Sequence, residues 1–177
     1  MIRQTIVTVH VGFSYGMFLV VKLVVIKMEV CLFEPEIAQN AGTIARLCTC
    51  FGVPMNIIEP ASFIIGSRDF RRAGMDYIER TNIKCHNSFQ EFRKSFDGRI
   101  ILLDVKATVP YFEFAYTKND CIMVGKESTG VPDDIYNLCD EKIIIPMVEG
   151  SRSLNVAVSL AIGLSEALRQ INYEQLH

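Results

Sequence analysis

The stretch Gly125-Lys-Glu-Ser-Thr-Gly-Val-Pro132 (GKESTGVP) follows the apolar run 121–124 and precedes residues with a helical pattern. In open α/β sheets, ligands bind at such turns, where the carboxyl end of a strand meets a helix. A phosphate-binding P-loop would place lysine and then serine or threonine after its second glycine, but Val131 and Pro132 stand there. Pro132 also lacks a backbone N–H. The turn therefore predicts a ligand site in an α/β fold, but not a triphosphate cradle.

Apolar runs and helical patterns alternate from Met28 onward, which is typical of a parallel β-sheet covered by helices. The pattern predicts strands near residues 29–33, 55–59, 82–85, 99–104, 120–124 and 142–145, and helices near 40–51, 67–73, 88–95, 132–139 and 153–171. The last helix is apolar on nearly every side over its first three turns. We expect this helix to form a homodimer contact, with burial in one enlarged core as the alternative.

The composition is that of one ordinary globular domain: 177 residues, 50% of them apolar and 21% charged. Six cysteines lie scattered without a CxxC pair, which predicts buried, reduced thiols in a cytoplasmic protein: Cys31, Cys48, Cys50, Cys85, Cys121 and Cys139. The three histidines are not spaced with cysteines or carboxylates as a zinc site requires. We therefore expect no metal.

Residues 1–27 differ from the rest, since their only formal charges are Arg3, Lys22 and Lys27. This segment is the one candidate membrane anchor or signal, but polar residues and glycines interrupt it and no small-residue cleavage site follows. We favour an extension outside a folded domain of residues 28–177, and whether Met1 or Met28 is the true start stays open. Residues 28–177 carry 15 basic and 20 acidic side chains, a net charge of −5. Any RNA binding must therefore use a local basic patch.

Two further polar features follow predicted strands. The segment 39–46 (QNAGTIAR) offers Asn40 as a helix N-cap and Arg46 in the second helical turn. Glu127, the one carboxylate of GKESTGVP, is suited to accept hydrogen bonds from the backbone or from a ligand. Taken alone, a capped helix with a solvated arginine is the favoured explanation of Asn40 and Arg46, and an exposed turn acid is the alternative for Glu127.

The third polar segment, residues 145–155 (IPMVEGSRSLN), enters the last predicted helix and places Ser153 and Asn155 at its start. The order N-x-G-x-x-x-R, G-x-E-x-x-G-x-P and I-P-M-x-x-x-S-x-S-L-N resembles the three motifs of the SPOUT class of RNA methyltransferases. Within it, the chain resembles the small tRNA ribose methyltransferases of the wobble nucleotide, through LFEPEIAQNAG (32–42) and RRAGMDY (71–77). The resemblance extends from Met28 to about Tyr173.

The resemblance implies a parallel sheet with helices on both faces and a deep trefoil knot formed by the C-terminal part of the chain. It also implies a homodimer and the cofactor S-adenosylmethionine, bound largely by backbone groups. The glycines of GKESTGVP then serve close backbone approach. The positions that match the cofactor site, or neighbour it, are Leu103, Gly125, Ile145, Met147, Ser153 and Leu154.

The implied reaction is attack of a ribose 2'-hydroxyl on the sulfonium methyl group. Arg46 matches the catalytic arginine of the family, as a general base or as a group that orients the substrate. We favour orientation because a guanidinium normally stays protonated. Asn40, Glu127, Ser153 and Asn155 match positions that hold substrate, loop and arginine in place.

An arginine cluster around RRAGMDY is the expected binding surface for a tRNA anticodon stem-loop across the dimer, with a solvated helix face as the alternative: Arg68, Arg71, Arg72 and Arg80. The third motif continues without the second asparagine that wobble-specific relatives often carry, and so resembles the wider 2'-O-methyltransferase group. Another tRNA or rRNA position, and a non-catalytic RNA-binding protein of this fold, remain the alternatives. The sequence leaves open which tRNAs are used, whether cytidine, uridine or both are methylated, and whether a prior anticodon modification is needed.

Overall fold

A computed structural model describes residues 8–12, 18–22 and 28–171. Strands β1 (Thr8–Gly12) and β2 (Phe18–Lys22) pair in antiparallel fashion as a two-stranded sheet. The expectations for the rest of residues 1–27, and for the chain beyond residue 171, lie outside the described residues. Within the described ranges, none of the helices combines the length and apolar character needed to cross a membrane.

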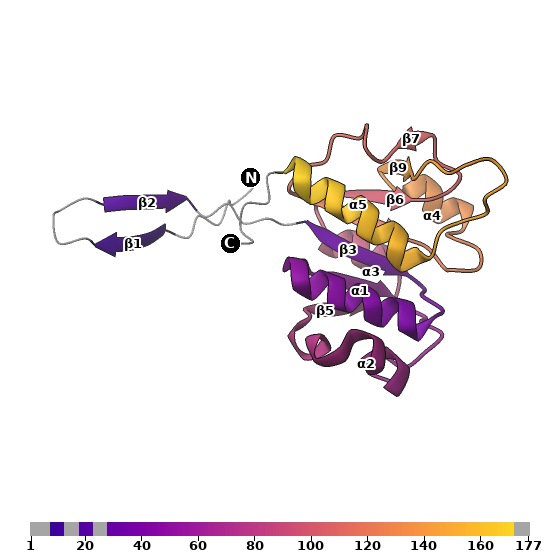
Figure 1. Cartoon of the computed structure of the whole chain (residues 1–177), viewed down its shortest axis with the longest axis horizontal. Coiled ribbons are helices and arrows are strands. Elements are labelled where there is room, and N and C mark those ends of the chain that lie inside the picture. The colour runs from indigo at the N-terminus through magenta and orange to yellow at the C-terminus, as the bar shows by residue number, and fades with distance from the viewer. Residues whose placement is uncertain (1–7, 13–17, 23–27, 172–177) are drawn as a thin grey trace.

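The main body is a seven-stranded sheet in the order β5-β4-β3-β8-β6-β9-β7, and its neighbouring strands are parallel (Figure 1). Its strands are β3 (Glu29–Phe33), β4 (Met55–Ile58), β5 (Ile83–His86), β6 (Arg99–Leu103), β7 (Val109–Pro110), β8 (Asp120–Val124) and β9 (Glu141–Ile144). The α/β class and all six predicted strands are confirmed to within two residues. The sequence did not predict β7, because two residues carry no readable alternation.

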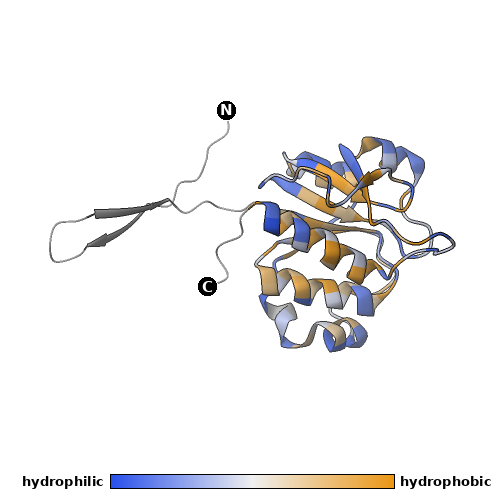
Figure 2. Ribbon diagram, turned by 45° about the horizontal axis from the view of Figure 1, so that its top comes forward, coloured by the Kyte–Doolittle hydropathy of each residue, from blue (hydrophilic) through white to orange (hydrophobic). Residues whose placement is uncertain are grey.

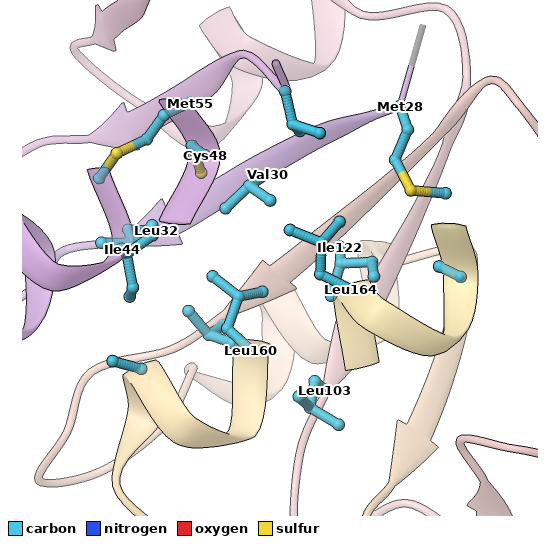
Figure 3. Close-up of a cluster of buried hydrophobic side chains, with 14 of the residues drawn as sticks. Met28, Val30, Leu32, Ile44, Cys48, Met55, Leu103, Ile122, Leu160 and Leu164 are labelled. Atoms are coloured by element: carbon cyan, nitrogen blue, oxygen red, sulfur yellow. The ribbon is translucent and has the colours of Figure 1, made fainter. Parts of the chain in front are cut away.

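Helices cover both faces of this sheet (Figure 1). They are α1 (Ala38–Phe51), α2 (Arg68–Gly74), the 3-10 helix η1 (Met75–Arg80), α3 (Phe89–Ser95), α4 (Asp133–Leu138) and α5 (Val156–Gln170). Successive side chains of a strand point to opposite faces. Val30 and Leu32 therefore pack with α1 and α5 (Figure 3), whereas Cys31 and Phe33 pack with α3 and α4. The helices accordingly alternate apolar and polar stripes (Figure 2).

Two of the predicted helix starts are wrong. Helix α1 begins two residues earlier than expected, its N-cap residue is Ile37, and Asn40 lies inside the first turn. Helix α5 begins at Val156, with Asn155 as the N-cap, whose side-chain oxygen accepts from the N–H groups of Ala157 and Val158 at 2.9 and 3.3 Å. Asn155 therefore caps this helix, whereas Ser153 lies in the loop before it.

The connection from β6 to β7 winds around β9. Leu103 of β6 and Val109 of β7 both pair with Ile143, from opposite sides of β9. The five residues 104–108 thus carry the chain from one side of this strand to the other. Asp104 N–H donates to the Ile143 carbonyl at 3.0 Å and Tyr111 N–H donates to the Ile144 carbonyl at 2.8 Å. This crossing holds the segments after β6 and β9 together at the carboxyl end of the sheet.

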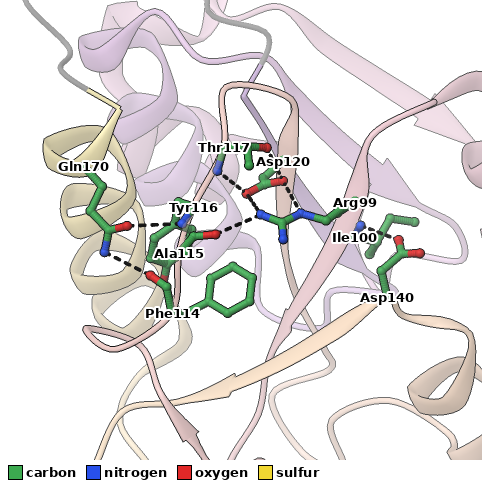
Figure 4. Close-up of polar contacts among 9 residues, drawn as sticks. All are labelled: Arg99, Ile100, Phe114, Ala115, Tyr116, Thr117, Asp120, Asp140 and Gln170. Atoms are coloured by element: carbon green, nitrogen blue, oxygen red, sulfur yellow. Dashed lines mark hydrogen bonds and ion pairs between the residues drawn. The ribbon is translucent and has the colours of Figure 1, made fainter.

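The opposite end of the sheet is fixed by an ion pair between the partly exposed Arg99 and a buried carboxylate (Figure 4). Asp120, at the start of β8, is fully buried and accepts from Arg99 Nε and Nη2 at 2.9 and 2.8 Å, and from Thr117 N and Oγ1 at 2.6 and 2.7 Å. A buried carboxylate is tolerable when its oxygens are satisfied in this way. Gln170 of α5 bonds to the backbone of Phe114 and Tyr116 nearby. The network thus anchors β6, β8 and α5 at the end remote from the ligand turn.

The prediction of buried, free cysteines holds for four of six. Cys31, Cys48, Cys121 and Cys139 are buried, and burial raises the pKa of Cys48 and Cys139 to about 12. Cys50 and Cys85 are exposed, so their expected burial was wrong. All six are free thiols.

Candidate ligand-binding site

A cavity of about 540 Å³ lies at the carboxyl ends of β6, β8 and β9. Its volume falls within the range of small-molecule sites, about 300–1,000 Å³. Residues from three predicted segments line it together, including every residue expected at a cofactor site: Leu103, Gly125, Ile145, Met147, Ser153 and Leu154. Asn40, Glu127 and Asn155 line it as well. The cavity is therefore where the polar motifs meet.

Two glycines allow the turn after β8 to close on itself. Lys126 and Gly130 exchange backbone hydrogen bonds of 3.0 and 2.9 Å. A Cβ on Gly125 would lie 2.5 Å from the carbonyl carbon of Gly130, and Gly130 itself has a positive φ of 71°. The two glycines therefore permit a close backbone approach within the turn.

Glu127 supplies the N-terminal cap that α1 lacks. The apolar N-cap Ile37 cannot accept a side-chain hydrogen bond. Instead, Glu127 accepts from the N–H groups of Glu36 and Ile37 at 2.8 and 3.3 Å, and from Asn40 Nδ2 at 3.1 Å. A carboxylate at this helix end also interacts favourably with the helix dipole. The turn after β8 and the start of α1 are thereby joined.

Two acids from the segment before α1 hold the same turn from the other side. Glu36 accepts from Ser128 N and Oγ, both at 2.8 Å, and these hydrogen bonds lower the pKa of Glu36. Glu34 pairs with Lys126 at 2.6 Å, which raises the pKa of Lys126. Together with the Glu127 contacts, these bonds join two segments that lie about ninety residues apart in the sequence, and they fix the turn.

Asn155 completes the link between the three motifs. Its Nδ2 donates to Asn40 Oδ1 at 2.9 Å, while Asn40 Nδ2 donates to Glu127. A continuous hydrogen-bonded chain thus runs from the turn after β8, through α1, to the cap of α5. Because these side chains bond to one another, they have a defined orientation at the cavity wall.

Arg46 does not line this cavity. Six residues separate it from Asn40, which is about 240° around an α-helix, so the two side chains leave α1 on different faces. Arg46 is exposed, its Nη1 donates to Met75 Sδ at 3.3 Å, and its guanidinium lies 5.3 Å from the centre of the Tyr77 ring. Within one chain, Arg46 therefore lies beside η1, away from the other site residues.

The expected arginine cluster lies around the same segment. Arg68, Arg71 and Arg72 are exposed on α2, and Arg80 is exposed at the end of η1. Helix α2 is held against α1, with Phe70 and Gly74 buried. Arg46 contacts the neighbouring η1, and we call these five exposed side chains the arginine surface; none of the five lines the cavity.

A second hollow adjoins the cavity on the outer face of α5. It shares Asn40 and Asn155 with the cavity and is otherwise lined by Thr43, Tyr111, Ala157, Val158, Ala161, Ile162, Ser165 and Glu166. Val158 is 49% exposed. The buried side of α5 consists of Ala157, Leu160, Gly163, Leu164, Ala167 and Leu168. The apolar side chains of α5 therefore pack into the core on one side of the helix. On the other side they form a partly exposed strip.

Among the further polar residues that line the cavity, the sequence did not single out Asp104, Lys126 and Arg152. Asp104 directly follows β6, so its place at a strand end was a usable signal. The other two are flanked by motif residues. Among the described residues, no group of three or more His, Cys, Asp or Glu side chains is arranged to hold a metal ion.

The chain is similar to known RNA-modifying proteins over most of its length. The model of the SpoU rRNA Methylase family matches residues 27–165. A tRNA (cytidine(34)-2'-O)-methyltransferase of Ancylobacter novellus is 46% identical over 146 residues, which cover 81% of this chain and 92% of the relative. The protein of that name from Escherichia coli (strain K12) is 36% identical over 149 residues, covering 82% and 95%.

A solved structure that addresses 2-OH methylation of C/U34 on tRNA superposes with a TM-score of 0.78 at 32% identity, covering 81% of this chain and 95% of the other. The resemblance inferred from the three motifs is thereby confirmed. The chain belongs to the SpoU rRNA Methylase family.

Proposed function

We propose that this protein is an S-adenosylmethionine-dependent tRNA 2'-O-ribose methyltransferase that acts on the wobble nucleotide, cytidine or uridine. The observation that carries the proposal is the convergence of the three motifs on one cavity, joined by the Glu127–Asn40–Asn155 chain. The names of the similar proteins from A. novellus and E. coli support the wobble position over another RNA position.

The cavity fits the proposed cofactor. Its apolar residues, among them Leu103, Ile145 and Leu154, suit an adenine ring, and its close-packed glycine turn brings backbone groups within reach of a ligand. When bound, S-adenosylmethionine supplies a methyl group on a positively charged sulfur. In the reaction, the ribose oxygen would bond to this carbon as the carbon–sulfur bond breaks, releasing S-adenosylhomocysteine, and the hydroxyl proton would pass to solvent.

The contacts of the chain's own residues support the roles that we propose for them. Glu127 and Asn155 orient Asn40 at the cavity wall, and Asn40 lies where it can position the incoming nucleotide. Ser153 lines the cavity from the loop before α5. Arg46 orients the ribose and its phosphate and stabilises developing charge.

Arg46 can take this role if a partner protomer carries it to the cavity. The second hollow, along the exposed strip of α5, shares Asn40 and Asn155 with the cavity. Thr43, which also lines this hollow, lies on α1 between the face that carries Asn40 and the face that carries Arg46. We therefore propose a homodimer packed through α5, in which each cavity receives Arg46 and the arginine surface from the other chain.

The proposal also includes the trefoil knot and a cytoplasmic location. The crossing of residues 104–108 around β9 supports a knotted C-terminal part. We further propose that residues 28–177 form the catalytic domain and that residues 1–27 are an extension of it, since the family match begins at residue 27.

The test is transfer of a labelled methyl group from S-adenosylmethionine to unmodified total tRNA, followed by nucleoside analysis. We expect label in 2'-O-methylcytidine or 2'-O-methyluridine, and mapping should place it at the wobble position. Label in another nucleoside would contradict the proposed position. Absence of cofactor binding would contradict the enzymatic function and favour a non-catalytic RNA-binding role.

Charge reversal on the arginine surface should weaken tRNA binding. We expect Arg71→Glu together with Arg72→Glu to lower tRNA affinity at least about tenfold and to reduce the salt dependence of binding, because two phosphate contacts are lost. Cofactor affinity should not change. The matched control, Lys94→Glu with Lys118→Glu, alters the same charge at exposed positions elsewhere. Equal tRNA affinity of the two double variants would remove Arg71 and Arg72 from the binding surface.

A further inference from the structure

Asp104 has a carboxylate oxygen that the protein leaves without a partner inside the cavity. Its Oδ1 accepts from Lys106 N–H at 2.8 Å. No side chain or backbone group among the described residues donates to its Oδ2. The other cavity carboxylate, Glu127, has both oxygens occupied by Glu36, Ile37 and Asn40. Asp104 is thus the cavity-lining acid, within the described chain, with a free oxygen to offer a ligand.

The position of this oxygen is fixed by the fold. Asp104 N–H donates to the Ile143 carbonyl, which holds its backbone against β9, and the Lys106 contact fixes its side chain. A Cβ on Gly130 would lie 3.1 Å from Oδ2, so the oxygen faces the glycine turn. Lys106 Nζ is directed to Asp133 at 3.6 Å instead. Within the described part of the chain, no ion pair therefore compensates the charge of Asp104.

We infer that Asp104 binds the ribose hydroxyls of the adenosyl cofactor, an inference that rests on the proposed function. An acid that follows a strand directly is well suited to accept hydrogen bonds from a ribose, as in dinucleotide-binding folds. The sulfonium is the less suitable partner. A carboxylate beside it would stabilise the charged ground state more than the transition state, in which that charge is being lost, and would slow transfer.

The test is the affinity for S-adenosylhomocysteine and for its 2',3'-dideoxy form, measured by calorimetry. Asp104→Ala should bind S-adenosylhomocysteine about 10- to 100-fold more weakly, because a charge-assisted hydrogen bond is lost. Asp104→Asn keeps an acceptor for Lys106 N–H, and we expect a smaller loss of about 3- to 10-fold. The wild-type protein should discriminate against the dideoxy form, and Asp104→Ala should not.

Asp134→Ala is the matched control, since it removes an exposed acid of equal charge that does not line the cavity, and its affinity should equal the wild type. Equal loss of affinity by Asp104→Ala for both ligands would overturn the ribose assignment. Unchanged binding in both Asp104 variants would overturn this inference alone. A wild-type protein that binds neither ligand would overturn the proposed function as well.

Discussion

Arg46→Ala should lower kcat for tRNA methylation by about 10³-fold, a loss in the range found when one positioned catalytic group is removed. Cofactor affinity should stay at the wild-type value, because the proposed role of Arg46 is to contact the ribose and phosphate of the substrate rather than the cofactor. The measurement is single-turnover methyl transfer at saturating tRNA, beside calorimetry with S-adenosylhomocysteine. The fold should survive, since Arg46 is exposed and its contact with the Tyr77 ring contributes only about 0.5–1 kcal/mol.

Arg46→Lys tests whether Arg46 acts by orienting the substrate or by its positive charge alone. Lysine keeps the positive charge but lacks the planar fork that binds phosphate and hydroxyl together. We therefore expect most of the rate loss to remain in this variant. A lysine variant with nearly wild-type kcat would show that charge alone suffices. Weak cofactor binding by Arg46→Ala would contradict its assignment to the substrate side of the site.

The sequence predicted those parts of the fold that depend on local pattern. Apolar runs of four or five residues became buried strands, and the polar segments after them met at one edge, because parallel strands bring their carboxyl ends together. The six cofactor-site positions came from the motif resemblance, and all of them line the cavity. Their roles toward a cofactor remain predictions.

Long-range contacts explain the errors. Asn40 was taken for an N-cap because its residue type suits that position, whereas the capping carboxylate comes from Glu127, 87 residues from Asn40 in the sequence. Sequence pattern carries no signal for such a contact. The separation of Arg46 from Asn40, by contrast, was readable from helical periodicity, since six residues do not return a side chain to the same face.

Gly125→Ala should abolish effective cofactor binding without unfolding the protein. The new Cβ would lie 2.5 Å from the carbonyl carbon and 2.8 Å from the Cα of Gly130, and these are backbone atoms that cannot rotate away. The turn must open, which breaks the Lys126–Gly130 hydrogen bonds and displaces Glu127. Overpacking of this kind costs about 1–3 kcal/mol. We expect the opened turn to lose its ligand contacts as well, so that affinity for S-adenosylhomocysteine falls about 100-fold.

The matched control is Gly163→Ala, in which the new Cβ meets Leu103 at an ordinary 3.6 Å. We expect it to bind the cofactor as the wild type does and to be at least as stable, because alanine favours a helix over glycine. Equal affinities of the Gly125 and Gly163 variants would contradict the close-approach role of the turn.

The two inactive variants, Gly125→Ala and Arg46→Ala, then test the proposed dimer together. If Arg46 acts in the partner's cavity, a mixed dimer contains one intact site, formed by the cavity of the Arg46→Ala chain and the arginine of the Gly125→Ala chain. Random mixing should restore about a quarter of wild-type activity, since about half of the dimers are mixed and each has one working site of two. If Arg46 acted within its own chain, every site in the mixture would carry a defect, and mixing would restore nothing.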